Sequence, residues 1–469
     1  MSATATLIRA GLGLLVTPML LASAPWSVIE TARDNGHRLT SVPAPMEGTT
    51  TADTIQLNPA ELFQEMVGFG GALTESSGWV LAQLPAAERA AVIRRYYDPV
   101  EGIGYTLGRT HINSCDFSLN LWELAPVPGD YDLHHFSLAP MRTWILPLIH
   151  EAQVTAGAER FKLLASPWSP PAWMKTNNRM DDGGSLRREY ASAWARYYVK
   201  FCQAMAAEEK IPVWALTVQN EPEAHQTWES CLYTPEQERD FIRDHLGPAL
   251  QGAGLAGVKL IGWDHNRDRI EARANALYGD PLSAQYLWGL GVHWYVSADY
   301  AASARVHEKF PDKTIIFTEG CVESGKLIGE WKNGERYARN MIGDFRHWVS
   351  GFIDWNIVLD QRGGPNHVGN FCDAPVIVNT LTKQVNYGSS FYYIAQFSKF
   401  VQPGAHRIAA VGGPTVLQTV AFINPDASLV LVVLNETERA VAFSLTAAGA
   451  TVACAIPAHA IQTYVQAVR

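Results

Sequence analysis

The chain has 469 residues, of which 47% are hydrophobic and 18% charged, and it shows no excess of Gly, Pro or Cys. This composition is typical of a globular protein and excludes disordered, collagen-like and coiled-coil classes. The 37 basic and 46 acidic side chains give a formal net charge of −9, which argues against a nucleic-acid partner because little positive charge is available to neutralise phosphates.

The first two dozen residues resemble an export signal. Arg9 supplies a basic start, residues 10–21 are apolar or small, and Ala22-Ser23-Ala24 resembles a cleavage site. Pro25 directly after that site is unfavourable for cleavage, so a membrane-anchored N-terminus or a mis-assigned start stays open. We expect residues 1–24 to be a signal peptide and the mature chain, without an integral membrane segment, to be secreted or periplasmic.

Residues 25–62 contain two short strand patterns, at 26–29 and 54–57, and no helix pattern. Isolated short strands need partners to be stable. We therefore expect this segment to join a sheet formed by the C-terminal end of the chain.

From residue 63 to residue 398 short apolar runs alternate with longer amphipathic ones, which is the pattern of βαβ units around a parallel sheet. One amphipathic run, residues 190–207, has aromatic side chains at steps of three and four, and another begins at Thr234-Pro235 with helix-start signals. Eight strands close a (β/α)₈ TIM barrel. The eight predicted strands are residues 67–73, 105–112, 162–165, 213–218, 258–263, 288–294, 314–318 and 352–358.

After about residue 399 the pattern changes to alternating runs typical of an all-β unit, which we expect to span residues 399–469. Its predicted strands are residues 415–423, 428–434, 441–445, 452–456 and 461–465. The predicted fold class is thus α/β: a TIM barrel with a small β unit built from both chain ends.

Catalytic residues of TIM barrels lie where the strands end, so the polar residues at those positions are candidates. The fourth predicted strand is followed by Asn220-Glu221-Pro222, and the seventh by Glu319. Two carboxylates facing each other across a barrel mouth can hydrolyse a glycosidic bond, because one protonates the leaving oxygen while the other attacks or stabilises the anomeric carbon. A lone Glu at such a position is more often a partner of loop amides, but the pair predicts a glycosidase, with Asn220 suited to bind a sugar hydroxyl.

The sequence gives no sign of a metal site. The six cysteines are scattered singly and the fourteen histidines include no H-E-x-x-H motif, so we expect no metal and at most one disulfide.

The motifs around these strand ends resemble those of glycoside hydrolase family 30, within it the acid β-glucosidase (glucosylceramidase) type. The matching pieces run in order along the chain. They are Gly68-Phe69-Gly70-Gly71-Ala72, Gly102-Ile103-Gly104-Tyr105, Ser114-Cys115-Asp116-Phe117-Ser118, Leu164-Ala165-Ser166-Pro167-Trp168, Asn220-Glu221-Pro222, Val292-His293-Trp294-Tyr295, Glu319-Gly320-Cys321, Asp354-Trp355-Asn356 and Gly363-Gly364-Pro365-Asn366. The resemblance implies a TIM barrel with a side β-sandwich, retaining hydrolysis and no cofactor.

The resemblance also implies a role for each matching residue. Glu221 would be the acid/base and Glu319 the nucleophile, while His293 and Tyr295 would line the pocket beside the nucleophile. The residues implied to hold the sugar in the first subsite are Asp116, Trp168, Asn220, Trp355 and Asn366.

The expected partner is a carbohydrate or glycolipid substrate, and the expected reaction is removal of a terminal β-glucosyl unit. Glu223, Glu229 and the short loop 224–229 differ from lipid-hydrolysing relatives, so an endo-β-1,6-glucanase of the same family stays an alternative. A non-catalytic carbohydrate-binding barrel is a further alternative, disfavoured because a binding protein needs no proton donor at the bond.

Overall fold

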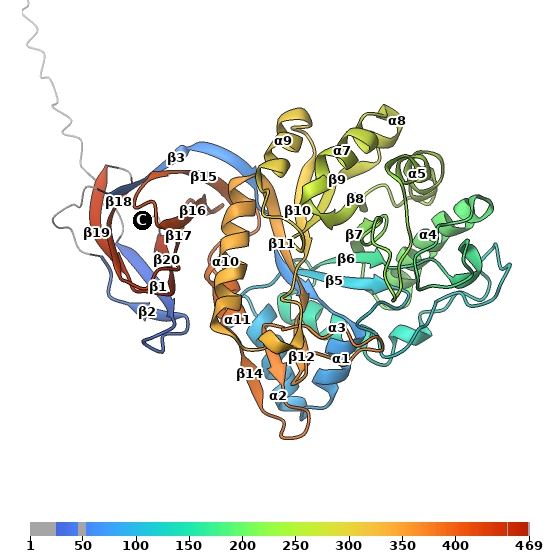
Figure 1. Cartoon of the computed structure of the whole chain (residues 1–469), viewed down its shortest axis with the longest axis horizontal. Helices are drawn as coiled ribbons and strands as arrows, with labels where there is room; N and C mark the ends of the chain where they lie inside the picture. Colours follow the sequence, from blue (N-terminus) through green and yellow to red (C-terminus); the bar gives the residue numbers. More distant parts are fainter. Residues whose placement is uncertain (1–24, 46–52, 448, 468–469) are drawn as a thin grey trace, which may run out of the picture.

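The computed structural model describes residues 25–45, 53–447 and 449–467, so the expected signal peptide lies outside the described residues. Eight parallel strands close a barrel in chain order (Figure 1), which confirms the predicted TIM barrel. Each overlaps one of the eight predicted strands. They are β4 (Gly68–Ala72), β5 (Leu107–Ile112), β6 (Lys162–Pro167), β7 (Val213–Thr217), β8 (Lys259–Asn266), β9 (Leu287–His293), β10 (Thr314–Glu319) and β11 (Val349–Asn356).

The barrel interior is filled by aliphatic side chains, as a packed core requires. Six strands each contribute one buried residue to this inner cluster: Leu107, Leu164, Ala215, Ile261, Ile316 and Ile353. The glycine-rich strand β4 lets its neighbour approach closely, since a Cβ atom at Gly70 would lie 2.0 Å from the Leu107 carbonyl oxygen.

Helices cover the outside of the barrel (Figure 1). The helix predicted at 190–207 is α4, and the start predicted at Thr234 is confirmed by a capping box, in which Thr234 and Gln237 bind each other's backbone N–H groups. The helices around and after the barrel are α1 (Glu75–Ala82), α2 (Ala86–Tyr97), α3 (Ile145–Ala156), α4 (Ala191–Ala207), α5 (Pro235–Phe241), α6 (Gly247–Gly252), α7 (Ile270–Tyr278), α8 (Pro281–Ala284), α9 (Ala301–Lys309), α10 (Trp331–Arg346) and α11 (Ser389–Ser398).

A small second sheet extends the loop after β11. Strands β12 (Val358–Asp360), β13 (Val376–Val378) and β14 (Val385–Tyr387) pair in that order, and the segment between β12 and β13 returns over the carboxyl end of the barrel. His367 N in that segment donates to Ser118 O, in the loop after β5. This contact brings loop residues that lie about 250 positions apart together at the barrel mouth.

The β unit is built from both chain ends, as predicted (Figure 1). It forms one sheet of nine strands in the order β19-β18-β3-β15-β16-β17-β20-β1-β2. Strand β15 was not predicted, and β3 is longer than its predicted residues 54–57, so the expected limit at residue 62 falls inside it. The strands are β1 (Trp26–Ala32), β2 (Thr40–Val42), β3 (Thr54–Glu65), β15 (His406–Gly412), β16 (Leu417–Ile423), β17 (Leu429–Asn435), β18 (Val441–Ala447), β19 (Ala450–Ile456) and β20 (Ala460–Gln466).

Helices α10 and α11 lie between the β unit and the barrel (Figure 1). Buried hydrogen bonds join α11 to the sheet, because Gln396 Nε2 donates to Thr31 Oγ1 at 3.1 Å and Thr463 Oγ1 donates to Gln396 O at 2.7 Å. Among the residues that the structure describes, no helix has the length and apolar character needed to cross a membrane.

Candidate active site

Glu319 is the last residue of β10 and lies at the carboxyl end of the barrel. The Tyr295 hydroxyl donates to Glu319 Oε1 at 2.9 Å, and the Arg109 guanidinium donates to Oε2. Both donors are fixed by the barrel, because Arg109 belongs to β5 and Tyr295 follows β9. Two hydrogen bonds, one to each oxygen atom, therefore hold the Glu319 carboxylate in one orientation.

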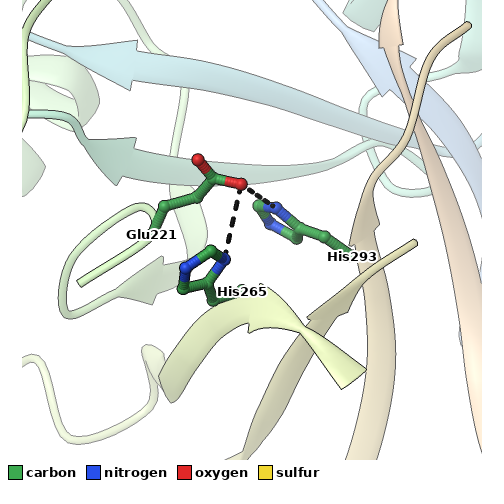
Figure 2. A group of neighbouring side chains, drawn as sticks. All are labelled: Glu221, His265 and His293. Carbon is green, nitrogen blue, oxygen red and sulfur yellow. Dashed lines mark hydrogen bonds and ion pairs between the residues drawn. The ribbon is translucent and has the colours of Figure 1, made fainter. Parts of the chain in front are cut away.

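Glu221 lies in the turn that follows β7. Its backbone has a positive φ of 48°, and its N–H donates to Asp264 O at 3.0 Å, which anchors this turn to the end of β8. Two imidazoles approach the same carboxylate oxygen: Oε1 lies 3.2 Å from His293 Nδ1 and 3.4 Å from His265 Nδ1 (Figure 2). The Glu221 side chain keeps 14% of its surface exposed, so it reaches the pocket while the two imidazoles contact its Oε1 atom.

Arg109 connects the two sides of the site. It is fully buried in β5 and donates to Glu319, to Asn220 Oδ1 at 2.9 Å and to Asp264 Oδ2 at 3.0 Å. Its guanidinium carbon also lies 4.9 Å from the centre of the Trp168 ring. A planar cation with several donors suits such a position, since one side chain can fix several acceptors at once.

His293 lies beneath the pocket, between the two proposed carboxylates. Its Nε2 is 3.0 Å from Asp264 Oδ1, and its Nδ1 is 3.2 Å from Glu221 Oε1 and 4.0 Å from Glu319 Oε1. The expectation that His293 lines the pocket needs correction, because the residue is fully buried and its ring nitrogens face these carboxylates. Tyr295, two residues later, does line the pocket.

The distances from His293 also limit the separation of the two carboxylates. The Oε1 atoms of Glu221 and Glu319 lie 3.2 Å and 4.0 Å from the same Nδ1 atom, so the distance between the two Oε1 atoms cannot exceed the sum of these two distances. Retaining glycosidases have carboxyl groups about 5–5.5 Å apart, whereas inverting ones have them about 6.5–9.5 Å apart. The limit for these two oxygen atoms thus includes the retaining spacing.

The ionisation of the site follows from these contacts. Burial alone raises the pKa of Glu221, but the hydrogen bonds and charges of His265 and His293 outweigh burial and leave this pKa lowered. For His293 burial acts in the opposite direction, yet the charge of Glu319 and the contacts with Asp264 and Glu221 raise its pKa to about 9. The pair of Glu221 and His293 therefore holds a proton across neutral pH, and that proton belongs to both groups.

A cavity of about 430 Å³ opens beside these residues. Trp168 and Trp355 form part of its wall and stack with ring centres 5.1 Å apart and an angle of 24° between the rings. Asp116 and Asn220 also line it, so the structure brings both proposed catalytic residues and four of the five expected sugar-binding residues to one pocket.

Asp116 combines burial with an unpaired oxygen. Asn370 Nδ2 donates to its Oδ2 at 3.0 Å, while its Oδ1 is buried without a hydrogen-bond partner in the structure. Burial, with the charge of Glu319, raises the pKa of Asp116 to about 8. A carboxyl group with a free buried acceptor is suited to bind a sugar hydroxyl, since a ligand would supply the missing hydrogen bond.

The expected role of Asn366 needs correction. Its Oδ1 accepts from the backbone N–H groups of residues 368, 369 and 370, and its Nδ2 donates to Asn370 O at 2.8 Å. These bonds use the Asn366 side chain to shape its own loop, and the residue does not line the pocket. Asn370, four residues later, takes the position expected of Asn366 and contacts Asp116.

Sequence reasoning missed Asp264, His265 and Asn266, which form the end of β8. The expected strand stops at residue 263, and the polar residues that follow it are the signal that points to this strand end. His265 and Asn266 line the pocket, and Asp264 lies behind them. Burial raises the pKa of Asp264, but the charge of Arg109 and the contacts with His293 outweigh burial and leave this pKa lowered. Arg109 was missed as well, and its charge inside a buried strand was the signal.

Some other residues singled out from sequence have structural partners. Glu223 forms ion pairs with Arg269 and with Arg273, so its charge is compensated outside the pocket. Glu229 is buried and pairs with His367 at 3.4 Å.

All six cysteines are free, and Cys321 and Cys372 belong to the pocket wall. Among the described residues, one group of three could ligate a metal ion: Glu221, His265 and His293.

Comparison with known proteins gives a consistent family. A family model described as glycosyl hydrolase family 30 TIM-barrel domain matches residues 66–401, and one described as glycosyl hydrolase family 30 beta sandwich domain matches residues 404–464. The lysosomal acid glucosylceramidase of Mus musculus is 36% identical, covering 85% of this chain and 80% of its own. An endo-1,6-beta-D-glucanase of Neurospora crassa is 30% identical, covering 91% of this chain and 92% of its own.

Solved structures are also similar to this chain. SrfJ from Salmonella typhimurium superposes with a TM-score of 0.90 at 32% identity, covering 95% of this chain and 100% of that chain. An endo-beta1,6-glucanase superposes with a TM-score of 0.87 at 29% identity, with the same coverage. The similar proteins thus carry names for two different substrates, a glucosylceramide and a β-1,6-glucan.

Proposed function

We propose that this chain removes a terminal β-glucosyl unit with retention of configuration. The chain belongs to glycosyl hydrolase family 30 and is a glycoside hydrolase. Glu319 is the proposed nucleophile and Glu221 the proposed acid/base. The observation that carries the proposal is the placement of both carboxylates around one His293 nitrogen, within a limit that includes the retaining spacing.

In the first step the Glu319 carboxylate attacks the anomeric carbon, and the leaving oxygen takes a proton from Glu221. The contacts of Glu319 support this role, because Tyr295 and Arg109 hold it as an acceptor-only carboxylate with a fixed direction. The products of this step are the released alcohol and a covalent glycosyl-enzyme in which Glu319 is esterified.

In the second step Glu221 acts as a base. It removes a proton from a water molecule, whose oxygen attacks the anomeric carbon, and Glu319 leaves as a carboxylate. The hydrogen-bonded pair of Glu221 and His293 supports both steps, since it can give a proton in the first and take one back in the second. Arg109 and Tyr295 stabilise the negative charge that returns to Glu319.

The first subsite is proposed to hold a single sugar ring. Trp168 and Trp355 offer a stacked aromatic surface, and Asp116 has a free buried acceptor. The Oδ1 atom of Asn220 is occupied by Arg109, which leaves its Nδ2 group as the donor for a sugar hydroxyl. These groups surround one ring with several polar contacts, and this favours a terminal unit over the interior of a chain.

An endo-β-1,6-glucanase is the second candidate, and one observation favours it. Trp228 and Gln226, both from the short loop after Glu221, line the edge of the pocket on the side of the proposed acid/base. A half-buried tryptophan beside polar groups can stack on a second sugar. A polysaccharide would use this edge as a further subsite.

A panel of substrates tests the two candidates directly. Aryl β-glucoside, glucosylceramide and β-1,6-glucan are each incubated with the enzyme, and the products are separated by size. The proposal predicts release of free glucose from the first two. Oligosaccharides from β-1,6-glucan, with aryl glucoside and glucosylceramide intact, would establish endo action instead.

We further propose that the enzyme acts outside the cytoplasm. The support is the sequence pattern of residues 1–24, with its basic start and small residues at 22–24. N-terminal sequencing of the protein recovered from the culture medium or periplasm tests this, with a mature chain starting near residue 25 expected. Recovery of an uncleaved chain in the cytoplasm would contradict it.

A further inference from the structure

We propose that Glu221, His265 and His293 form a binding site for a divalent transition-metal ion such as Zn²⁺, and that the bound ion reversibly inhibits the enzyme. One ligand atom from each of the three residues lies within 4.8 Å of the others. Figure 2 shows the two imidazole rings converging on the carboxylate of Glu221. Imidazole nitrogen and carboxylate oxygen are the ligands that Zn²⁺ uses in sites with an open fourth position.

The spacing of the ligand atoms fits a tetrahedral ion. Bonds of about 2.0–2.1 Å at tetrahedral angles separate neighbouring ligand atoms by about 3.3–3.4 Å. Glu221 Oε1 lies 3.2 Å from His293 Nδ1 and 3.4 Å from His265 Nδ1, so two of the three separations already have this length. The third separation, between the two ring nitrogens, is within 4.8 Å.

The surrounding residues orient the two histidines as ligands. His293 Nε2 lies 3.0 Å from Asp264 Oδ1, and a carboxylate on one ring nitrogen directs the other nitrogen to a metal. Asn266 Oδ1 accepts from Tyr295 N at 2.8 Å, so its amide Nδ2 faces His265 Nδ1 at 3.3 Å. Because that amide can only donate, Nδ1 of a neutral His265 ring accepts from it with its lone pair, and a bound ion would take the place of this hydrogen bond.

The local charge also favours a cation. When the ion replaces the proton held by Glu221 and His293, which is released to solvent, the carboxylates of Glu221, Asp264 and Glu319 surround the site, and Arg109 pairs with the last two. His265 and Glu221 keep 12% and 14% of their side-chain surface exposed and line the pocket, which gives the ion a path of entry and room for a water as fourth ligand.

Metal binding would stop hydrolysis by occupying the oxygen atom of Glu221 that shares a proton with His293. The inhibition therefore rests on the proposed function, whereas the binding does not. The site differs from a catalytic zinc centre, because here the ion displaces the proton donor of a reaction that the carboxylates carry out themselves.

Calorimetric titration of the EDTA-treated full chain with ZnCl₂ tests the binding. One ion per chain is expected, and the His265→Asn variant should bind it at least about a hundredfold more weakly, because a direct ligand is lost. His225→Asn is the matched control: His225 lies in the same loop as Glu221, is exposed and pairs with Asp182 at 3.0 Å, so its loss should leave zinc affinity unchanged.

Two further measurements locate the ion. Anomalous diffraction at the zinc edge should place it about 2.0–2.2 Å from the three ligand atoms. Cys321 and Cys372 are neighbouring thiols in the same pocket wall and form the competing soft ligand pair. Zinc affinity that survives His265→Asn but is lost in Cys372→Val, or the absence of stoichiometric binding to the unmodified chain, would overturn the proposal.

Hydrolysis assays separate this inference from the proposed function. Each variant is compared with its own zinc-free activity on an aryl β-glucoside, and zinc should inhibit the unmodified enzyme and the His225→Asn control but not His265→Asn. If zinc binds at the three residues while hydrolysis continues unchanged, the inhibitory role is wrong. If the zinc-free enzyme cleaves no glycoside and zinc still binds there, the proposed function fails and the metal site stands.

Discussion

Tyr295→Phe removes one hydrogen bond from the proposed nucleophile and leaves the aromatic ring in place. The Tyr295 hydroxyl donates to Glu319 Oε1 at 2.9 Å, and a hydrogen bond to a charged group contributes about 1.5–3 kcal/mol. During the second step Glu319 leaves the sugar and regains its charge, so the donor stabilises that transition state. In the first step the same charge is lost, and the bond helps the ground state more.

The variant should therefore slow the second step in particular. If the full bond strength is lost in that step, its rate falls about tenfold or more. With an activated aryl glucoside, kcat should fall by this factor, KM should fall with it, and kcat/KM should change much less. Rapid mixing should show a burst of released aryl alcohol equal to the enzyme concentration, because the glycosyl-enzyme accumulates.

A matched variant controls for the loss of a tyrosine hydroxyl in general. Tyr300 donates to Asn340 Oδ1 at 3.1 Å outside the pocket, so Tyr300→Phe should keep the kinetic constants of the unmodified enzyme. An unchanged kcat in Tyr295→Phe, or an equal loss of kcat and kcat/KM without a burst, would refute the reasoning about the second step.

Two further predictions concern ionisation. His293→Gln removes the group that shares a proton with Glu221. The kcat/KM profile for a poor leaving group should have its alkaline limb near pH 9 in the unmodified enzyme, and this limb should move to lower pH in the variant. An unmoved limb would exclude His293 from the proton transfer. Asp116 has its pKa raised from 3.8 to about 8, so the native state loses stability as pH rises through this window, and Asp116→Asn should increase the free energy of unfolding at pH 7 by at least about 1 kcal/mol. Denaturant unfolding at pH 4 and pH 7 measures this, and a gain of equal size at both values would contradict the assigned ionisation.

The barrel could be predicted from sequence because its strands are short apolar runs between amphipathic helices, and that pattern is local. The end of β8 could not be placed correctly, because Trp263 and Asp264 both have positive φ values and the pairing with β9 shifts register there. Such a bulge breaks the alternation of side chains on which strand prediction depends. For that reason His265 entered the site without being expected.

Other parts of the site depend on contacts between distant segments. Arg109 is a charged residue in a buried strand, and only its bonds to Asn220, Asp264 and Glu319, from three other strand ends, explain it. The choice between Asn366 and Asn370 was likewise decided by loop shape, since both asparagines follow the same motif and only the second reaches Asp116. Sequence pattern marks Arg109 as an unusual residue for a buried strand, but it does not contain these contacts or the shape of the loop.

The roles of Glu221 and Glu319 are tested most directly by adding azide to the two alanine variants and determining the anomeric configuration of the product. In Glu221→Ala the glycosyl-enzyme still forms from an activated aryl β-glucoside, and azide should intercept it to give the β-glucosyl azide. In Glu319→Ala azide should attack the substrate itself and give the α-glucosyl azide. Exchange of the two anomers between the variants would show that the roles are reversed, and an α-configured first product from the unmodified enzyme would contradict the retaining mechanism.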